Sequence, residues 1–156
     1  MSDFPALAEL AAEEAELQLS RFTNDDAWAL GSALVAHGRA EQLPIAVEVS
    51  RHSHQLFHAA LTGATPDNDQ WIARKARTVH RFGHSSLAVG QRFREMGTTF
   101  EEGAGLDPEL YAAHGGAFPV RVPGAGVIGV VTVSGLPQAD DHALVVEAIE
   151  TFLAAG

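Results

Sequence analysis

Apolar side chains recur with helical spacing in five parts of the chain. In the clearest of them, Ala27, Leu30, Leu34 and Val35 follow the i, i+3, i+7, i+8 pattern of an amphipathic helix, behind capping side chains at 23–26. By the same reasoning, helices are expected at residues 4–17, 24–37, 70–82, 85–96 and 139–153, with a further helical turn around 107–113.

Two other stretches predict β-hairpins. Apolar runs at 45–49 and 55–61 flank a polar break, and runs at 118–122 and 127–133 flank a glycine-rich turn. The 127–133 run is apolar at both odd and even positions, which is typical of a central strand with both faces covered. We therefore expect one α+β domain, residues 1–156, in which helices cover an antiparallel sheet.

The composition is that of an ordinary globular protein. Of 156 residues, 46% are hydrophobic and 19% are charged. No run reaches the roughly 18 apolar residues that span a bilayer, and the acidic start lacks the pattern of a signal peptide. Because there is no cysteine, disulfides and thiolate metal sites are excluded. We expect a cytoplasmic protein with no membrane partner.

Charge argues against one class of partner and draws attention to one helix. A formal net charge of −10 repels phosphate backbones, so nucleic acid is not expected as a partner. Basic residues nevertheless gather at Arg74, Lys75, Arg77 and Arg81. Lys75 falls on the buried stripe of its predicted helix, so its side chain either reaches back to solvent or faces a polar pocket.

Glycine and polar residues are concentrated between residues 114 and 142. Gly115 and Gly116 precede a strand and let the backbone approach a ligand closely, although a plain loop explains them as well. Ser134 ends the central strand, and Gly135 lies just before the last helix, whose N-terminus can receive an anion. Positive charge facing such an anion would come from the basic helix, through Arg74 or Lys75.

A metal site is not expected. His52, His54 and His58 would share one face of a continuous strand, but the polar break interrupts that strand. We interpret these histidines as exposed residues of a turn.

The sequence gives equally weak support for a hydrolase triad. A triad could be assembled from Ser134, Asp140 or Asp141, and His142, but the serine lacks the G-x-S-x-G elbow that would expose it. We interpret Ser134 as the end of a strand and Asp140 as a helix cap.

Several long motifs resemble a known family. They are Thr65-Pro66-Asp67-Asn68-Asp69-Gln70-Trp71-Ile72-Ala73-Arg74-Lys75, His84-Ser85-Ser86, Tyr111-Ala112-Ala113-His114-Gly115-Gly116-Ala117-Phe118-Pro119-Val120, and Val131-Thr132-Val133-Ser134-Gly135-Leu136-Pro137 through Asp141-His142. Over nearly the whole chain they resemble an uncharacterised UPF-type family in the haem-degrading-domain superfamily, whose members are GlcG-like and HbpS-like. This resemblance implies a profilin-like antiparallel sheet of about five strands flanked by helices, and a homo-oligomer.

The resemblance also suggests a cofactor. Some relatives bind haem, and a haem site here would use His114 and His142 as candidate axial ligands, with Lys75 and Arg74 near its carboxylates. The alternative is that both histidines only hydrogen-bond to the ends of strands or helices. We expect a non-catalytic or weakly catalytic module that binds haem or another small anionic ligand. The other hypotheses are an oligomeric interaction or chaperone-cofactor protein, and an enzyme acting on a small organic acid.

Overall fold

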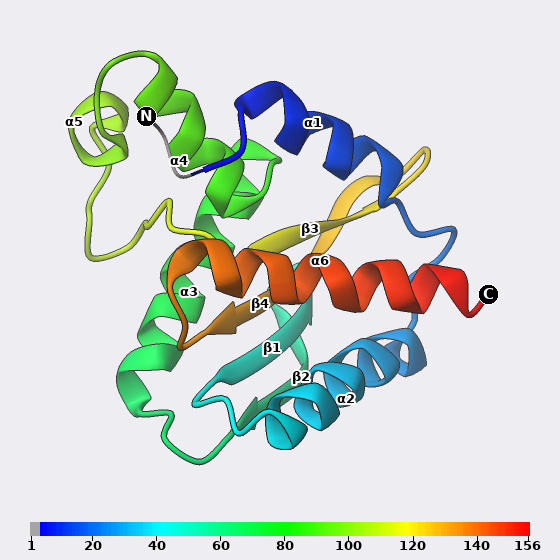
Figure 1. Cartoon of the computed structure of the whole chain (residues 1–156). Helices are drawn as coiled ribbons and strands as arrows, with labels where there is room; N and C mark the ends of the chain where they lie inside the picture. Colours follow the sequence, from blue (N-terminus) through cyan, green and yellow to red (C-terminus); the bar gives the residue numbers. More distant parts are fainter. Residues whose placement is uncertain (1–3) are drawn as a thin grey trace.

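A computed structural model describes residues 4–156 as six helices around a four-stranded antiparallel sheet (Figure 1). The elements are α1 (Leu7–Glu16), α2 (Asn24–Ala40), β1 (Ala46–Arg51), β2 (His54–Ala60), α3 (Pro66–Phe82), α4 (Ser86–Glu95), α5 (Phe100–Ala104), β3 (Ala117–Val122), β4 (Gly126–Ser134) and α6 (Gln138–Ala154). The predicted α+β class is confirmed. None of these helices is long and apolar enough to cross a bilayer.

The sheet has the order β2-β1-β4-β3, so both predicted hairpins are present and β4 is a central strand as expected. Four strands form in the described part of the chain, fewer than the expected number of about five. The physical reason is that the sequence outside the two hairpins has helical spacing or is broken by glycine and proline, and it folds as helices and turns.

The two faces of the sheet are covered differently. On one face, α2 and α6 bury a continuous apolar core that includes Leu30, Val131 and Val145. On the other face, α3 packs mainly over β4 and β3, where Val79 contacts the strands next to Val130. On this face α3 reaches over β1 but hardly over β2, so the polar outer side of β2 is left largely open.

Helix starts follow from capping side chains. Thr23 and Asp26 form a capping box at α2, and Thr65 and Asn68 form one at α3. Because Thr65 caps the helix and Pro66 takes its first position, α3 begins four residues before the predicted Gln70.

The segment between α4 and β3 differs most from expectation. A short helix, α5, lies there and was not predicted, because only Phe100 of its five residues is buried and no periodic stripe can be read. The turn predicted around 107–113 is a single turn, which the amide of Tyr111 closes by donating to the carbonyl of Asp107 at 3.0 Å.

Candidate functional site

A polar cavity of about 270 Å³ lies where the N-terminal turns of α3 and α6 meet the end of β4. In Figure 1 these three elements come together at the left-hand edge of the molecule. The cavity is lined by Asp67, Asn68, Trp71, Lys75, His114, Gly115, Ser134, Gly135, Leu136, Gln138 and Asp141.

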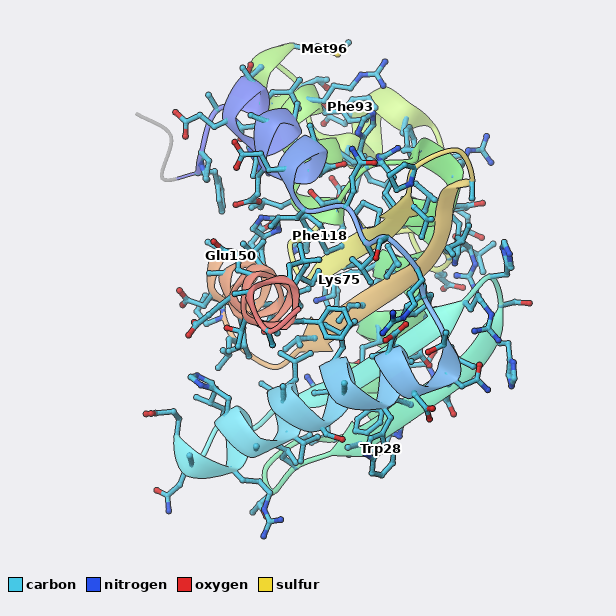
Figure 2. All side chains as sticks on the ribbon, turned by 90° about the vertical axis from the view of Figure 1, so that its right-hand side faces the viewer. Trp28, Lys75, Phe93, Met96, Phe118 and Glu150 are labelled. Atoms are coloured by element: carbon cyan, nitrogen blue, oxygen red, sulfur yellow. The ribbon has the colours of Figure 1, made fainter. Side chains whose placement is uncertain are left out.

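Lys75 lines the cavity and is only 2% exposed. Figure 2 labels it in the interior of the molecule. Its ammonium donates to the carbonyls of Gly115 at 3.0 Å and Val133 at 2.6 Å, and it lies 3.5 Å from an oxygen of Asp141. It therefore faces a polar pocket and does not reach back to solvent. One side chain of α3 thus ties the lead-in to β3, the end of β4 and the first turns of α6 together.

Asp141 holds the start of α6 against the end of β4. One of its oxygens accepts from the amide of Leu136 at 3.0 Å, and the other faces Lys75. Exposed backbone amides beside a helix N-terminus are a place where an anion can bind. Here the protein's own carboxylate already occupies that place.

Burial moves the pKa values of both partners. It lowers the pKa of Lys75 from 10.5 to about 8, although the negative charge of Asp141 opposes this change. It raises the pKa of Asp141 from 3.8 to about 6, although Lys75 and the backbone amides oppose that change. Near neutral pH both groups are ionised, and both lie unusually close to gaining or losing a proton.

The glycines around Lys75 allow close packing of backbone. Gly116 has φ +132°, and a Cβ atom there would lie 2.4 Å from both the Lys75 Nζ and the carbonyl oxygen of Val133. Gly135 has φ +148°, and a Cβ atom there would lie 2.3 Å from the carbonyl oxygen of Pro44. Both positions therefore need glycine for reasons internal to the fold.

Other groups point toward the cavity with capacity to spare. The Asn68 amide donates to the Ser134 hydroxyl at 3.3 Å, and the Gly115 amide donates to the Gln138 side-chain oxygen at 3.0 Å. The amide nitrogen of Gln138 and the hydroxyl proton of Ser134 have no partner among the described residues.

The cavity has one aromatic wall. The rings of Trp71 and His114 lie 5.0 Å apart, and burial lowers the pKa of His114, which favours its neutral form. Arg74 stacks on Trp71 with its guanidinium 4.4 Å from the ring centroid, and its Nε donates to the carbonyl of Pro108 at 3.0 Å. The guanidinium of Arg74 therefore lies beside the cavity and is not part of its lining.

The structure does not bring His142 to this cavity. Its Nε2 lies 2.7 Å from a carboxylate oxygen of Glu13 in α1, and its ring lies 5.9 Å from that of Phe118. Successive residues of a helix point about 100° apart, so His142 faces α1 while Asp141 faces Lys75. The residue types of a hydrolase triad are thereby separated as well.

Five of the eight predicted site residues line the cavity, and Gly116 lies directly behind it. Six residues that were not among the predicted ligand contacts also line it, namely Asp67, Asn68, Trp71, Leu136, Gln138 and Asp141. Most of them lie at or near the starts of two helices. Polar side chains are common there as helix caps, so their presence in the sequence does not by itself indicate a binding site.

A family model and individual relatives point to the same protein family. Residues 22–150 match the family model described as haem degrading protein HbpS-like. A UPF0303 protein of Streptomyces coelicolor is 61% identical over 149 residues, covering 96% of this chain and 94% of that protein. A UPF0303 protein of Edwardsiella ictaluri is 46% identical over 153 residues, covering 98% of each chain.

Solved structures share the fold. The crystal structure of the Ybr137w protein has a TM-score of 0.88 and 34% identity, covering 99% of this chain and 90% of that chain. A structure described as the PduOC:Heme complex has a TM-score of 0.67 and 19% identity, covering 83% of this chain and 93% of that one. At that level of identity the second likeness concerns the fold alone.

Proposed function

The chain belongs to the HbpS-like family and, within it, resembles the UPF0303 proteins throughout its length, and we propose that its cavity binds a small anionic ligand with carboxylate-like oxygens. The observation that carries the proposal is the set of donors, on Ser134 and Gln138, that face the cavity between two helix N-termini. Each N-terminus of a helix contributes the equivalent of about half a positive charge, so acceptor oxygens are favoured there.

Lys75 has a supporting part in this proposal. Its three donors are directed to Gly115, Val133 and Asp141, so the ligand does not need to bind the ammonium directly. Lys75 instead fixes the backbone on which the ligand-facing groups are mounted. Its positive charge also balances Asp141, one of the two carboxylates that line the cavity.

The size and polarity of the cavity favour a ligand smaller than haem. Pockets that enclose drug-sized ligands measure roughly 300–1,000 Å³, and this cavity measures about 270 Å³. A haem macrocycle needs an apolar slot, whereas most of the side chains here are polar. The cavity as it stands therefore does not fit haem.

Tryptophan fluorescence can test the proposal, because the chain has two tryptophans and only Trp71 lines the cavity. In a Trp28→Phe variant, Trp71 is the sole reporter. We expect a saturable change in emission with at least one of lactate, citrate and inorganic phosphate, and none with neutral lactamide. Trp71→Phe, which keeps the remote and 65% exposed Trp28, should show no saturable change.

One substitution sharpens the test. Gln138→Glu keeps an oxygen that can accept from Gly115 but adds a negative charge to the cavity, so it should weaken binding at least about tenfold. Gln18→Glu adds the same charge away from the cavity and should leave affinity unchanged. The proposal fails if no probe saturates, or if both glutamate variants behave alike.

Haem, which would need a wider cavity than this one, is the second candidate, and it is favoured by the family description and by the neutral, half-buried His114. Haemin titration distinguishes the two candidates. A saturable Soret shift that is lost in His114→Ala and kept in His142→Ala would identify haem, and not a small anion, as the ligand.

A further inference from the structure

A row of arginines runs along the outer face of α3. Arg74, Arg77 and Arg81 are spaced i, i+3 and i+7, which places them on one side of the helix. They are three of the ten basic residues in a chain of net charge −10. We call these three side chains the arginine row.

The arginine row has no carboxylate partner. None of the ion pairs formed within residues 4–156 includes a member of the row. Each guanidinium instead donates to the segment 108–111: Arg74 to the carbonyl of Pro108, Arg77 to the carbonyl of Leu110, and Arg81 to the Tyr111 hydroxyl at 3.5 Å. A guanidinium carries five N–H donors, so most of the donors in the row remain available.

Aromatic rings fix the row in place. Arg74 lies over Trp71, and the guanidinium carbons of Arg77 and Arg81 lie 6.0 and 5.6 Å from the centroid of Tyr111. Because stacking and carbonyl contacts already hold these side chains, little conformational entropy remains to be lost when a partner binds. Positioned arginine forks suit bidentate binding of carboxylates.

Space for a partner lies next to the row. A groove of about 360 Å³ runs between α3 and the open face of the β1–β2 hairpin, and Arg77 borders it together with His80 and His52. The acidic residue in its lining, Glu48, is bonded to the Gln55 amide at 2.7 Å.

We infer that the arginine row and this groove dock an extended acidic segment of a protein partner. Arg74 and Arg81 are about 10 Å apart along the helix axis. An extended chain rises about 3.3 Å per residue, so acidic residues at alternate positions of a short segment match the row. The overall charge of −10 disfavours a long polyphosphate chain, whereas a short acidic segment experiences mainly the local field within about 8 Å. This inference does not depend on the cavity between α3 and α6.

Fluorescence anisotropy of a short fluorescein-labelled peptide of alternating Glu and Ser tests the inference at low salt. We expect saturable binding to the full chain, and a loss of at least about tenfold in Arg77→Gln/Arg81→Gln. The matched control is Arg39→Gln/Arg92→Gln, which removes the same charge from exposed positions outside the row and should change affinity less than about twofold. The affinity for a peptide of alternating Lys and Ser should not fall in either variant.

A second variant tests whether the loss of affinity comes from lost charge or from a disturbed 108–111 segment. Arg77→Lys/Arg81→Lys keeps both charges and should bind the acidic peptide more tightly than the glutamine variant does, with unchanged circular dichroism. The inference is overturned if the acidic peptide does not bind, if both glutamine variants lose equal affinity, or if the lysine variant binds no better than the glutamine variant. Tighter binding of an oligothymidine than of the peptide at the same row would also overturn it.

Discussion

Burial moves the pKa values of Lys75 and Asp141 toward each other, and each change costs stability near neutral pH. The raised pKa of Asp141 gives stability that is fully present below pH 3.8 and is lost as pH rises through about 6. The lowered pKa of Lys75 gives stability that is present above pH 10.5 and is lost as pH falls through about 8. Both contributions are therefore smallest between about pH 6 and 8.

Asp141→Asn should remove one part of this pH dependence. Relative to the variant, the free energy of unfolding of the unmodified protein should fall by on the order of 2 to 3 kcal/mol between pH 4 and 6, because only it holds a proton more tightly when folded. Urea denaturation at several pH values measures this difference. Asp140→Asn removes the same charge from the exposed neighbouring position as a control. Parallel curves for the unmodified protein and Asp141→Asn would contradict the raised pKa.

Single residues also show where sequence reasoning reached its limit. The helical pattern alone placed Lys75 on a buried stripe, but it did not distinguish a side chain that reaches back to solvent from one that faces a polar pocket. Only the fold shows that Lys75 faces the pocket. His142 is buried on the inward side of the last helix. Its partner Glu13 lies 129 residues away in sequence, and no local pattern reports such a contact.

At the scale of elements, local patterns predicted both hairpins and the central position of β4, because apolar runs between turns mark strands and a run that is apolar on both faces marks a covered strand. They did not predict α5, whose single buried side chain gives no period. They also did not predict the cavity, because it forms where the ends of α3, β4 and α6 meet, and the relative placement of ends depends on packing across the whole sheet.

Gly116→Ala should disrupt the junction between the lead-in to β3 and the end of β4. The alanine Cβ would lie 2.4 Å from the carbonyl oxygen of Val133, and φ +132° is strained for alanine. We expect a loss of about 2 to 4 kcal/mol in the free energy of unfolding, measured by urea denaturation.

Gly124→Ala is the matched control for this junction. Gly124 has φ +84°, but a Cβ atom there would have no neighbour within 4 Å. The control should therefore lose only about 1 kcal/mol from backbone strain. Equal losses in the two variants would show that close packing at Gly116 contributes nothing beyond its dihedral angle.

At the scale of the molecule, the surface keeps several large apolar side chains in solvent. Trp28 and Met96 are each 65% exposed, Leu110 is 45% exposed, and Figure 2 shows Trp28 and Met96 at opposite ends of the molecule. On the side of the sheet that faces α3, the edge strand β2 also lacks a covering helix in the described part of the chain. Scattered apolar residues are ordinary, but an edge strand that is covered on one side only favours contact with another subunit.

We expect native mass spectrometry to show a homo-oligomer, a multiple of 16.5 kDa. Because Trp28 lies against Phe57 of β2, with ring centroids 5.5 Å apart, Trp28→Arg should shift the mass distribution toward smaller species. Met96→Arg, at the distant end, is the control. A single 16.5 kDa species of the unmodified protein at micromolar concentration would contradict the expectation.

The contact between Glu13 and His142 joins two helices that are synthesised at different times. Glu13 lies in α1 and leaves the ribosome before His142, which lies in α6. Until then α1 lacks one of its buried polar contacts, and the His142 Nε2 would have no partner if α1 failed to return. The contact that joins α1 to α6 can therefore form only after α6 has been synthesised, whereas α1 packs mainly against α4, which is made earlier.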